Sequence, residues 1–323
     1  MKSKLFIGVD IGGTKILAGL ISHSGQVLSR KKSSVPKKSS PQSILKTVSN
    51  LIKELLDKEN CSIKSLGGIG LGVPGIVDPD KGKILVTPNT NLSGFALGPA
   101  LKKKFKLKIA LGNDVNLGVL GEKWLGAGKG VKNLVGIFPG TGVGGGIIIN
   151  GQLLTGSHGA AAELGHIVME LNGPLCTCGN RGCLEAMTGR WAIERDIRQA
   201  VKNGQKTIVT KLVDGKLAVI KSKTLREALD KEDPIVTEIM TRVSQTLGLA
   251  CISIRHLFDP EMIIFGGGII EACGNFLLPI IRKVTGKDPL FSKIPKCKIV
   301  ESQLGDDAVI LGAVALVKKM EVL

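Results

Sequence analysis

The chain has 323 residues, 43% of them hydrophobic and 22% charged, which is enough apolar material for two domains. No apolar run reaches the roughly 20 residues of a membrane-spanning helix, and the first residues lead directly into a strand pattern, so we expect neither a membrane span nor a signal peptide. The net charge of +17 comes from lysines spread along the chain, and aromatic residues are only 3%, with no tyrosine. Because aromatic stacking platforms are scarce, we expect no binding of nucleic acid. The expected lack of a membrane span and of a signal peptide predicts a cytoplasmic location.

The first half of the chain begins with three short apolar runs separated by turn residues, a pattern typical of a strand meander. An amphipathic helix follows, with apolar residues at helical spacing. The expected elements are strands over 5–10, 16–22 and 26–30, a helix over 43–57, a strand over 67–73, a helix over 97–104 and a strand over 108–111.

The second half repeats this plan, with a meander followed by alternating helices and strands. The expected elements are strands over 134–138, 146–150 and 152–155, helices over 189–202, 224–229 and 234–257, a strand over 262–265, a helix over 275–284, a strand over 298–301 and a helix over 307–319. Two similar units of this kind predict a duplicated α/β architecture.

Two glycine-rich turns occupy equivalent places in the two halves. The first, DIGGTK at 10–15, lets the backbone approach a phosphate closely, and Asp10 could hold Mg²⁺ through water; an ordinary hairpin is the alternative. The second, PGTGVGGG at 139–146, matches G-x-G-x-x-G, but it leads into a strand rather than a helix, which argues against a dinucleotide fold. Facing each other across a cleft, the two turns would suit the phosphates of a nucleotide.

Two polar segments offer candidate substrate contacts. GNDVN at 112–116 ends a predicted strand and opens a helix, so Asp114 is a candidate base for a substrate hydroxyl; a helix N-cap is the alternative role. Asn89, in the loop TPNTN at 87–91, could hydrogen-bond a sugar hydroxyl, and a simple turn is the alternative there.

The strongest signal is the segment 163–185, ELGHIVMELNGPLCTCGNRGCLE. Its potential ligands are His166, Cys176, Cys178 and Cys183. Three thiols and an imidazole in a short loop rich in Gly, Pro and Asn are the ligand set of a closed, tetrahedral, structural zinc site. The other four cysteines are scattered singly, which argues against a disulfide framework. Because Glu163 and Glu185 flank the ligands, we expect this loop also to shape a pocket.

Together these motifs resemble the ROK family of bacterial sugar kinases, in particular its glucokinase-like members. The resemblance runs from Asp10 to LGDD at 304–307 and rests above all on the signature C-x-C-G-x-x-G-C-x-E, preceded by E-x-G-H. It implies an α/β fold of the actin, hexokinase and Hsp70 type, which is ribonuclease H-like, with two duplicated domains and a cleft between them. We expect a small domain over 1–113 and 308–323, to which the last helix crosses back, and a large domain over 114–307 that carries the zinc loop.

Carried over position by position, the resemblance implies ATP-dependent phosphorylation of a hexose, most simply glucose, with Asp114 as the catalytic base. The implied sugar contacts are Asn89, Asn113, Asp114, Glu163, His166 and Glu185. The implied ATP contacts are Asp10, Gly12, Gly13, Thr14, Lys15, Gly140, Thr141 and Gly142 around the phosphates and Gly266, Gly267 and Gly268 around the adenosine. Mg²⁺ would accompany ATP, and His166 would serve both the zinc ion and the sugar.

Several alternatives stay open at this stage. N-acylmannosamine, fructose or mannose could replace glucose, and polyphosphate could replace ATP. A sugar-sensing regulator without catalysis is a further reading, against which the intact Asp114 and both glycine turns argue. Some family members are repressors with an N-terminal DNA-binding domain, for which we expect no room before Asp10. The sequence LSGF at 92–95 stands where the family commonly has a tryptophan, and Val115 where it usually has alanine. The family suggests a homodimer or homotetramer.

Overall fold

The structure is a computed structural model that describes residues 4–35, 40–87 and 90–322. The chain divides into two compact units. Unit 1 comprises Met1–Gly130, Gly146–Ala162 and Asp306–Leu323, and unit 2 comprises Val131–Gly145 and Glu163–Gly305. The domain boundaries expected from the sequence, after residues 113 and 307, stay a prediction.

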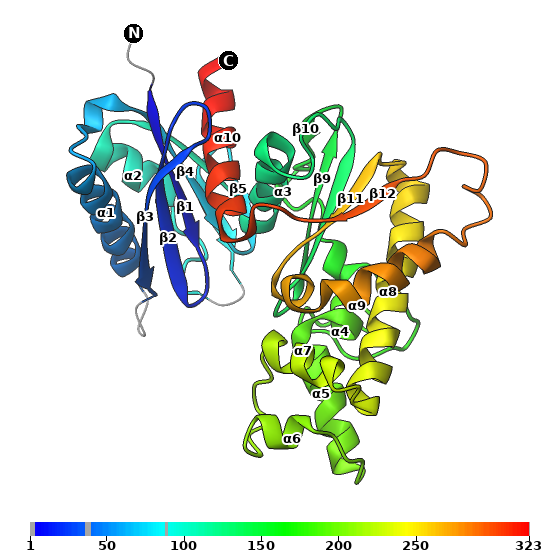
Figure 1. Cartoon of the computed structure of the whole chain (residues 1–323). Coiled ribbons are helices and arrows are strands. Elements are labelled where there is room, and N and C mark those ends of the chain that lie inside the picture. The colour runs from blue at the N-terminus through cyan, green and yellow to red at the C-terminus, as the bar shows by residue number, and fades with distance from the viewer. Residues whose placement is uncertain (1–3, 36–39, 88–89, 323) are drawn as a thin grey trace. The chain divides into compact units, whose positions relative to one another are not determined.

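The first five-stranded sheet belongs to unit 1 and has the strand order β3-β2-β1-β4-β7 (Figure 1). β1, β2 and β3 are antiparallel neighbours, whereas β4 and β7 extend the sheet in parallel with β1. The strands are β1 (Leu5–Ile11), β2 (Lys15–Ile21), β3 (Val27–Ser34), β4 (Leu66–Val73) and β7 (Lys108–Asn113), and the hairpin β5 (Ile76–Asp78) and β6 (Lys83–Val86) lies outside this sheet.

The two faces of this sheet are covered differently because successive residues of a strand point to opposite sides. Ile7 and Val9 of β1 belong to an apolar core with the buried face of helix α1 (Pro41–Lys58). Gly8, between them, faces helix α10 (Ala308–Val322), and a Cβ atom there would lie 2.1 Å from the carbonyl oxygen of Ile310. Glycine therefore lets the α10 backbone lie directly on the sheet, and the last helix packs in unit 1 (Figure 1).

The remaining helical elements of unit 1 precede or follow its parallel strands in the chain. They are a 3-10 turn (Ile63–Ser65), α2 (Leu97–Phe105) and α3 (Asp114–Leu125), and a further 3-10 turn (Gly305–Asp307) precedes α10. Helix α1 begins with a capping box in which Ser40 and Ser43 bond each other's backbone N–H, and Pro41 occupies the first turn. These local signals explain why the predicted helix 43–57 forms where it does.

The second sheet has the order β10-β9-β8-β11-β12, which repeats the order of the first. Here too the later strands are parallel, β11 pairing with both β8 and β12. The strands are β8 (Leu134–Pro139), β9 (Val143–Ile149), β10 (Gln152–Leu153), β11 (Met262–Phe265) and β12 (Lys298–Glu301). The repeated order confirms the duplicated α/β architecture that the sequence predicts.

The helices of unit 2 are clustered between β10 and β12 in the chain. They are a 3-10 turn (Leu164–His166), α4 (Leu184–Thr188), α5 (Arg190–Lys202), α6 (Val209–Leu212), α7 (Ser222–Asp230), α8 (Pro234–Phe258) and α9 (Gly268–Thr285). Among the described residues, none of the helices combines the length and apolar character needed to cross a bilayer.

The starts of α9 and β9 are among the element boundaries that differ from the sequence-based expectation, as does the end of β3 at Ser34 rather than at residue 30. Helix α9 begins at Gly268 rather than near residue 275, because Gly267 adopts a φ of 81° and accepts the first helical hydrogen bond, from Glu271. Strand β9 begins at Val143, inside the glycine run that was expected to be a turn. Gly146 serves close packing instead, since a Cβ there would lie 2.7 Å from a methyl group of Val119.

Candidate functional site

In unit 1, the sheet register brings two aspartates together. Asp10 of β1 lies beside Gly72 of β4, and Gly72 lies beside Gly112 of β7, at the carboxyl ends of the parallel strands. Asp114 follows two residues later, and its Cα atom lies 3.5 Å from where a Cβ of Gly72 would be. The predicted base and the predicted magnesium-binding carboxylate are therefore close neighbours.

Asp114 is the first residue of α3, and the N-cap role belongs to its neighbour. The Asn113 side chain accepts a hydrogen bond from the N–H of Asn116 (3.0 Å) and donates one to the carbonyl of Gly75 (3.0 Å). Asp114 accepts a bond from the N–H of Val115 (2.9 Å) through Oδ1. Asn113 is thus committed to holding the strand–helix junction. Asn89, the other predicted amide contact, lies outside the described residues.

The electrostatics of this pair favour a proton or a cation. Burial raises the pKa of Asp10 to about 7, and the nearby charge of Asp114 acts in the same direction. Lys15 opposes this rise, and Asp306 adds to it. Two carboxylates that repel each other in a half-buried place gain from a divalent cation, and carboxylate oxygens are the ligands Mg²⁺ prefers. The residues therefore fit Mg²⁺.

The first glycine turn forms an exposed tip between β1 and β2. Gly12 donates its N–H to the carbonyl of Lys15 (2.9 Å), while Gly13 and Thr14 are exposed. The Lys15 ammonium lies 3.2 Å from a carboxylate oxygen of Asp306. Lys15 is thus held next to the tip by a residue from the segment that leads into α10.

Sequence reasoning gave Asp306 and Asp307 no role, although both lie in the LGDD segment. Asp306 also pairs with Lys32 (2.9 Å), and Asp307 forms a two-pronged pair with Arg30. Lys32 and Lys15 together lower the pKa of Asp306. Because these partners are 270 or more positions away in the chain, no local signal could have revealed them.

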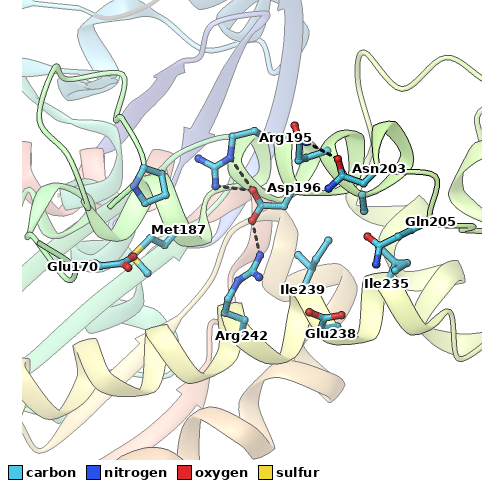
Figure 2. A pocket seen from close by; sticks show the side chains of 13 residues that line it. Glu170, Met187, Arg195, Asp196, Asn203, Gln205, Ile235, Glu238, Ile239 and Arg242 are labelled. Atoms are coloured by element: carbon cyan, nitrogen blue, oxygen red, sulfur yellow. Dashed lines mark hydrogen bonds and ion pairs between the residues drawn. The ribbon is translucent and has the colours of Figure 1, made fainter. Parts of the chain in front are cut away.

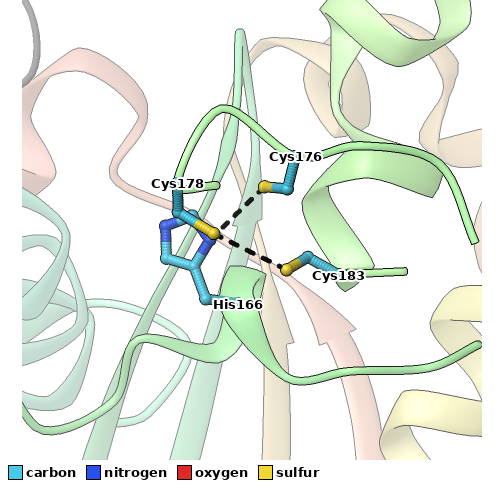
Figure 3. A group of neighbouring side chains, drawn as sticks. All are labelled: His166, Cys176, Cys178 and Cys183. Carbon is cyan, nitrogen blue, oxygen red and sulfur yellow. Dashed lines mark hydrogen bonds between the residues drawn. The ribbon is translucent and has the colours of Figure 1, made fainter. Parts of the chain in front are cut away.

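In unit 2, the four predicted ligands converge on one point (Figure 3). Their ligand atoms all lie within 4.8 Å of one another, and the ligands are His166, Cys176, Cys178 and Cys183. The sulfurs of Cys178 and Cys183 are 3.7 Å apart, as are the Cys176 sulfur and Nδ1 of His166. Two sulfurs each about 2.3 Å from a tetrahedral zinc would be separated by about 3.8 Å. The residues therefore fit Zn²⁺ as a closed, four-ligand site.

The ligand loop is held by turns and short bridges rather than by regular strands. Cys176 accepts the N–H of Gly179 and donates its own to the carbonyl of Asn180, closing a tight turn that aims its thiol inward. Gly182 has a φ of 70°, and a Cβ there would collide with the carbonyl of Glu170 at 1.8 Å. Cys183 then N-caps α4. The glycines between the cysteines are therefore structural requirements of the loop.

The two glutamates that flank the ligands have different surroundings. Glu185 is 9% exposed and accepts four hydrogen bonds, from the N–H of Val143 (3.0 Å), the hydroxyl of Thr177 (3.0 Å), the indole of Trp191 (3.4 Å) and the thiol of Cys176 (4.0 Å). Glu163 is more accessible. Desolvation raises its pKa, the charge of His166 opposes this rise, and the charge of Glu185 adds to it. The glutamates and the imidazole thus lie within electrostatic reach of one another.

The second glycine turn packs on the start of α5. The carbonyls of Gly140 and Thr141 accept the backbone N–H groups of Arg190 (3.0 Å) and Trp191 (3.3 Å), and the Thr141 hydroxyl accepts a bond from the Arg190 guanidinium (2.9 Å). Gly140 also donates its N–H to the carbonyl of Gly142 (2.8 Å). The turn is therefore hydrogen-bonded both within itself and to the first residues of α5.

The third glycine segment joins β11 to α9. Gly266 packs against the ring of Phe138, where a Cβ would approach within 2.5 Å, and Gly267 lies against the carbonyl of Pro139. Gly268 opens α9, where the first backbone N–H groups of a helix lack helical partners. This segment thus combines a helix N-terminus with close backbone packing.

A separate groove of about 460 Å³ lies among the ligand loop, α4, α5 and α8 (Figure 2). Asp196 is held there between Arg195 (2.7 Å) and Arg242 (2.6 Å). The residues that line this groove include none of the predicted site residues that the structure describes. The convergence of predicted residues, rather than this groove, therefore marks the candidate site.

Comparison with known proteins decides the family. The ROK family profile matches residues 6–320. The chain belongs to the ROK family. It is 37% identical to a glucokinase of Thermotoga maritima over 97% of both chains, and 30% identical to a xylose repressor of Caldicellulosiruptor bescii over 96% of this chain and 77% of that one.

Among solved structures, a ROK family glucokinase from Streptomyces griseus, in complex with glucose and AMPPNP, superimposes with a TM-score of 0.83 at 31% identity, covering 98% of this chain and 99% of that one. This likeness confirms the expected duplicated α/β fold of the actin and hexokinase type, and it confirms the family resemblance on which the site residues were named.

Proposed function

We propose that the protein is a sugar kinase that transfers the γ-phosphoryl group of ATP to a hexose, with glucose as the preferred acceptor. The observation that carries this proposal is the end-to-end match to glucokinases in a chain that keeps Asp114 beside Asp10 at the strand ends.

In the proposed reaction, the 6-hydroxyl of the sugar attacks the γ-phosphorus of ATP. Its proton passes to the Asp114 carboxylate, and the bond between the γ-phosphorus and the bridging oxygen breaks, so that ADP leaves with that oxygen. The backbone N–H groups of the two glycine turns would receive the phosphate oxygens. Catalysis of this kind depends on positioning and electrostatics more than on covalent chemistry.

Two metal ions have proposed roles. Asp10 would hold Mg²⁺ through water, and the ion would supply positive charge to the phosphates of ATP, while Asp114 stays available as the base. His166 and the three cysteines would hold Zn²⁺, which with four protein ligands leaves no open position and is therefore structural. The proposed sugar contacts in unit 2 are Glu163, His166 and Glu185, and the family resemblance adds Asn89 and Asn113 to this set.

A coupled assay of ADP release tests the function. Purified protein with MgATP is offered glucose, mannose, fructose and N-acetylmannosamine in turn, and polyphosphate replaces ATP in a parallel series. We expect glucose to give the highest kcat/KM and ATP to be the donor. Absence of ADP release with every sugar, in protein that binds sugar by calorimetry, would favour a regulator like the xylose repressor among its relatives.

Three further properties are part of the proposal. We expect a homodimer or homotetramer in solution, a cytoplasmic location and no affinity for nucleic acid. Light scattering after size-exclusion chromatography measures the first. Titration with duplex DNA at two salt concentrations tests the last, since binding driven by charge would weaken steeply as salt rises.

A further inference from the structure

Glu185 connects two segments to which the proposed function gives different ligands. Its Oε2 atom accepts the backbone N–H of Val143, the residue that follows the glycine turn proposed for ATP. Its Oε1 atom accepts the hydroxyl of Thr177, which lies between two cysteines of the ligand loop proposed for the sugar. Because the side chain is only 9% exposed, water offers little substitute for either bond.

The Glu185 carboxylate packs closely against the glycine turn at Gly142. A Cβ atom at Gly142 would lie 2.2 Å from Oε2 of Glu185, so the turn and the carboxylate are in direct contact. By contrast, a Cβ at Gly140, in the same turn, would meet nothing within 4 Å. A movement of the turn at Gly142 therefore has to displace the carboxylate, whereas a change at Gly140 does not.

Trp191 makes a second bridge between the same two segments. Its backbone N–H bonds the carbonyl of Thr141 in the glycine turn, and its indole donates to Oε1 of Glu185 (3.4 Å). Its ring packs against the buried cluster of Cys176, Cys183 and Ala186. The ligand loop, α5 and the glycine turn are thus joined through one buried carboxylate.

We propose that Glu185 couples sugar binding to nucleotide binding, with Thr177 and Trp191 as the residues that position it. This inference rests on the proposed function and adds a mechanism of synergy within unit 2. A sugar that engages Glu185 would fix its carboxylate and thereby fix the N–H of Val143 and the turn at Gly142. Nucleotide binding would then cost less ordering of the turn, and by thermodynamic linkage the nucleotide would strengthen sugar binding by the same factor.

The first test measures glucose affinity by calorimetry with no nucleotide present. Gly142→Ala should weaken glucose binding by about 5- to 10-fold, the cost of disturbing one or two hydrogen bonds of the carboxylate. Gly140→Ala is the matched control, since it makes the same change in the same turn without touching Glu185, and its glucose affinity should stay within about 2-fold of wild type. Equal glucose affinities for the two variants would overturn the proposal.

The second test measures the coupling itself and does not depend on whether Gly142→Ala folds. The affinity of MgAMPPNP is determined with and without saturating glucose, and the ratio is the coupling factor. Thr177→Val removes the hydroxyl donor to Oε1 and should reduce this factor about 3- to 10-fold. Thr188→Val is the control, because within the described part of the chain the Thr188 hydroxyl bonds only the carbonyl of Leu184, in α4. It should leave the factor unchanged.

The outcomes separate this inference from the proposed function. A wild-type protein that phosphorylates glucose but binds MgAMPPNP equally well with and without it would overturn the coupling and leave the function standing. A coupling factor in Thr177→Val equal to that of wild type would do the same. A wild-type protein that neither binds nor phosphorylates any hexose would overturn both.

Discussion

The carboxylate pair of unit 1 and the Cys/His cluster of unit 2 are both candidate metal sites, but the chain builds them in opposite ways. Asp10 and Asp114 lie at the ends of strands whose register is fixed by a sheet packed on both faces. The cluster lies in a loop held by tight turns and two isolated bridges, Val168 with Cys183 and Leu175 with Arg181. The first arrangement should persist without a ligand, whereas the second should depend on the metal that fills it.

The largest expected effect concerns the carboxylate pair and tests whether Asp114 is the catalytic base. Asp114→Asn keeps the Oδ1 acceptor for Val115 but removes the base, so kcat should fall at least about 100-fold, while glucose affinity by calorimetry changes little. Asp307→Asn, which removes a carboxylate from the same unit at its pair with Arg30, should keep its turnover. Near-normal kcat in Asp114→Asn would remove it from the role of base.

The second largest expected effect concerns the loop that carries the Cys/His cluster, and it tests whether the loop depends on its metal. Cys178→Ser removes one of four ligands, and we expect zinc content to fall below one per chain and glucose affinity to weaken by about 10-fold or more as the loop loses order. Metal content is measured by mass spectrometry and affinity by calorimetry. Cys297→Ser, at a half-buried thiol outside the cluster, serves as the control. Zinc-free protein with unchanged glucose affinity would show that the loop is rigid on its own.

The smallest expected effect is on the pH dependence of thermal stability, and it tests the raised pKa of Asp10. The pKa of Asp10 is raised from about 3.8 to about 7, so the folded state holds a proton that the unfolded state has lost, and stability falls as pH rises across this window. Asp10→Asn removes that penalty. In metal-free buffer its gain in Tm should therefore be larger at pH 8 than at pH 5, by roughly 3–6 °C.

Asp78 provides a control of opposite sign for this measurement. The backbone N–H of Lys81 lowers the pKa of Asp78, which favours the folded state once the carboxyl is ionised. Asp78→Asn should therefore lose stability at pH 8 rather than gain it. A Tm gain of Asp10→Asn that is the same at both pH values would show that its carboxyl titrates normally.

Much of the fold was predictable because its signals are local. The meanders follow from short apolar runs with turn residues, and the helix at 43–57 follows from its apolar spacing and from the caps at Ser40 and Ser43. The cluster of ligands was predictable from cysteine spacing alone, since a short loop leaves few ways to arrange three thiols. Asp114 could be named from its place between a strand and a helix.

Other features depend on partners distant in the chain and carry no local signal. The pairs of Asp306 with Lys15 and of Asp307 with Arg30 are of this kind. Gly144 and Gly145 suggest a turn from their sequence, yet they belong to β9, which begins at Val143. Helix α9 was predicted too short because the expected helix began only after Gly274, whereas the pattern of buried residues continues on the N-terminal side of that glycine.

The seating of α10 on Gly8 and Gly70 has a consequence for the order of assembly during synthesis. The carbonyls of Ile310 and Ala313 fill the space above these two glycines, on strands made at the start of translation. The face of the unit 1 sheet that α10 covers therefore stays exposed to solvent until nearly the whole polypeptide has been synthesised. A nascent chain that stalls before residue 308 would present that bare face to chaperones and proteases, and loss of the final helix would damage the earliest part of the protein first.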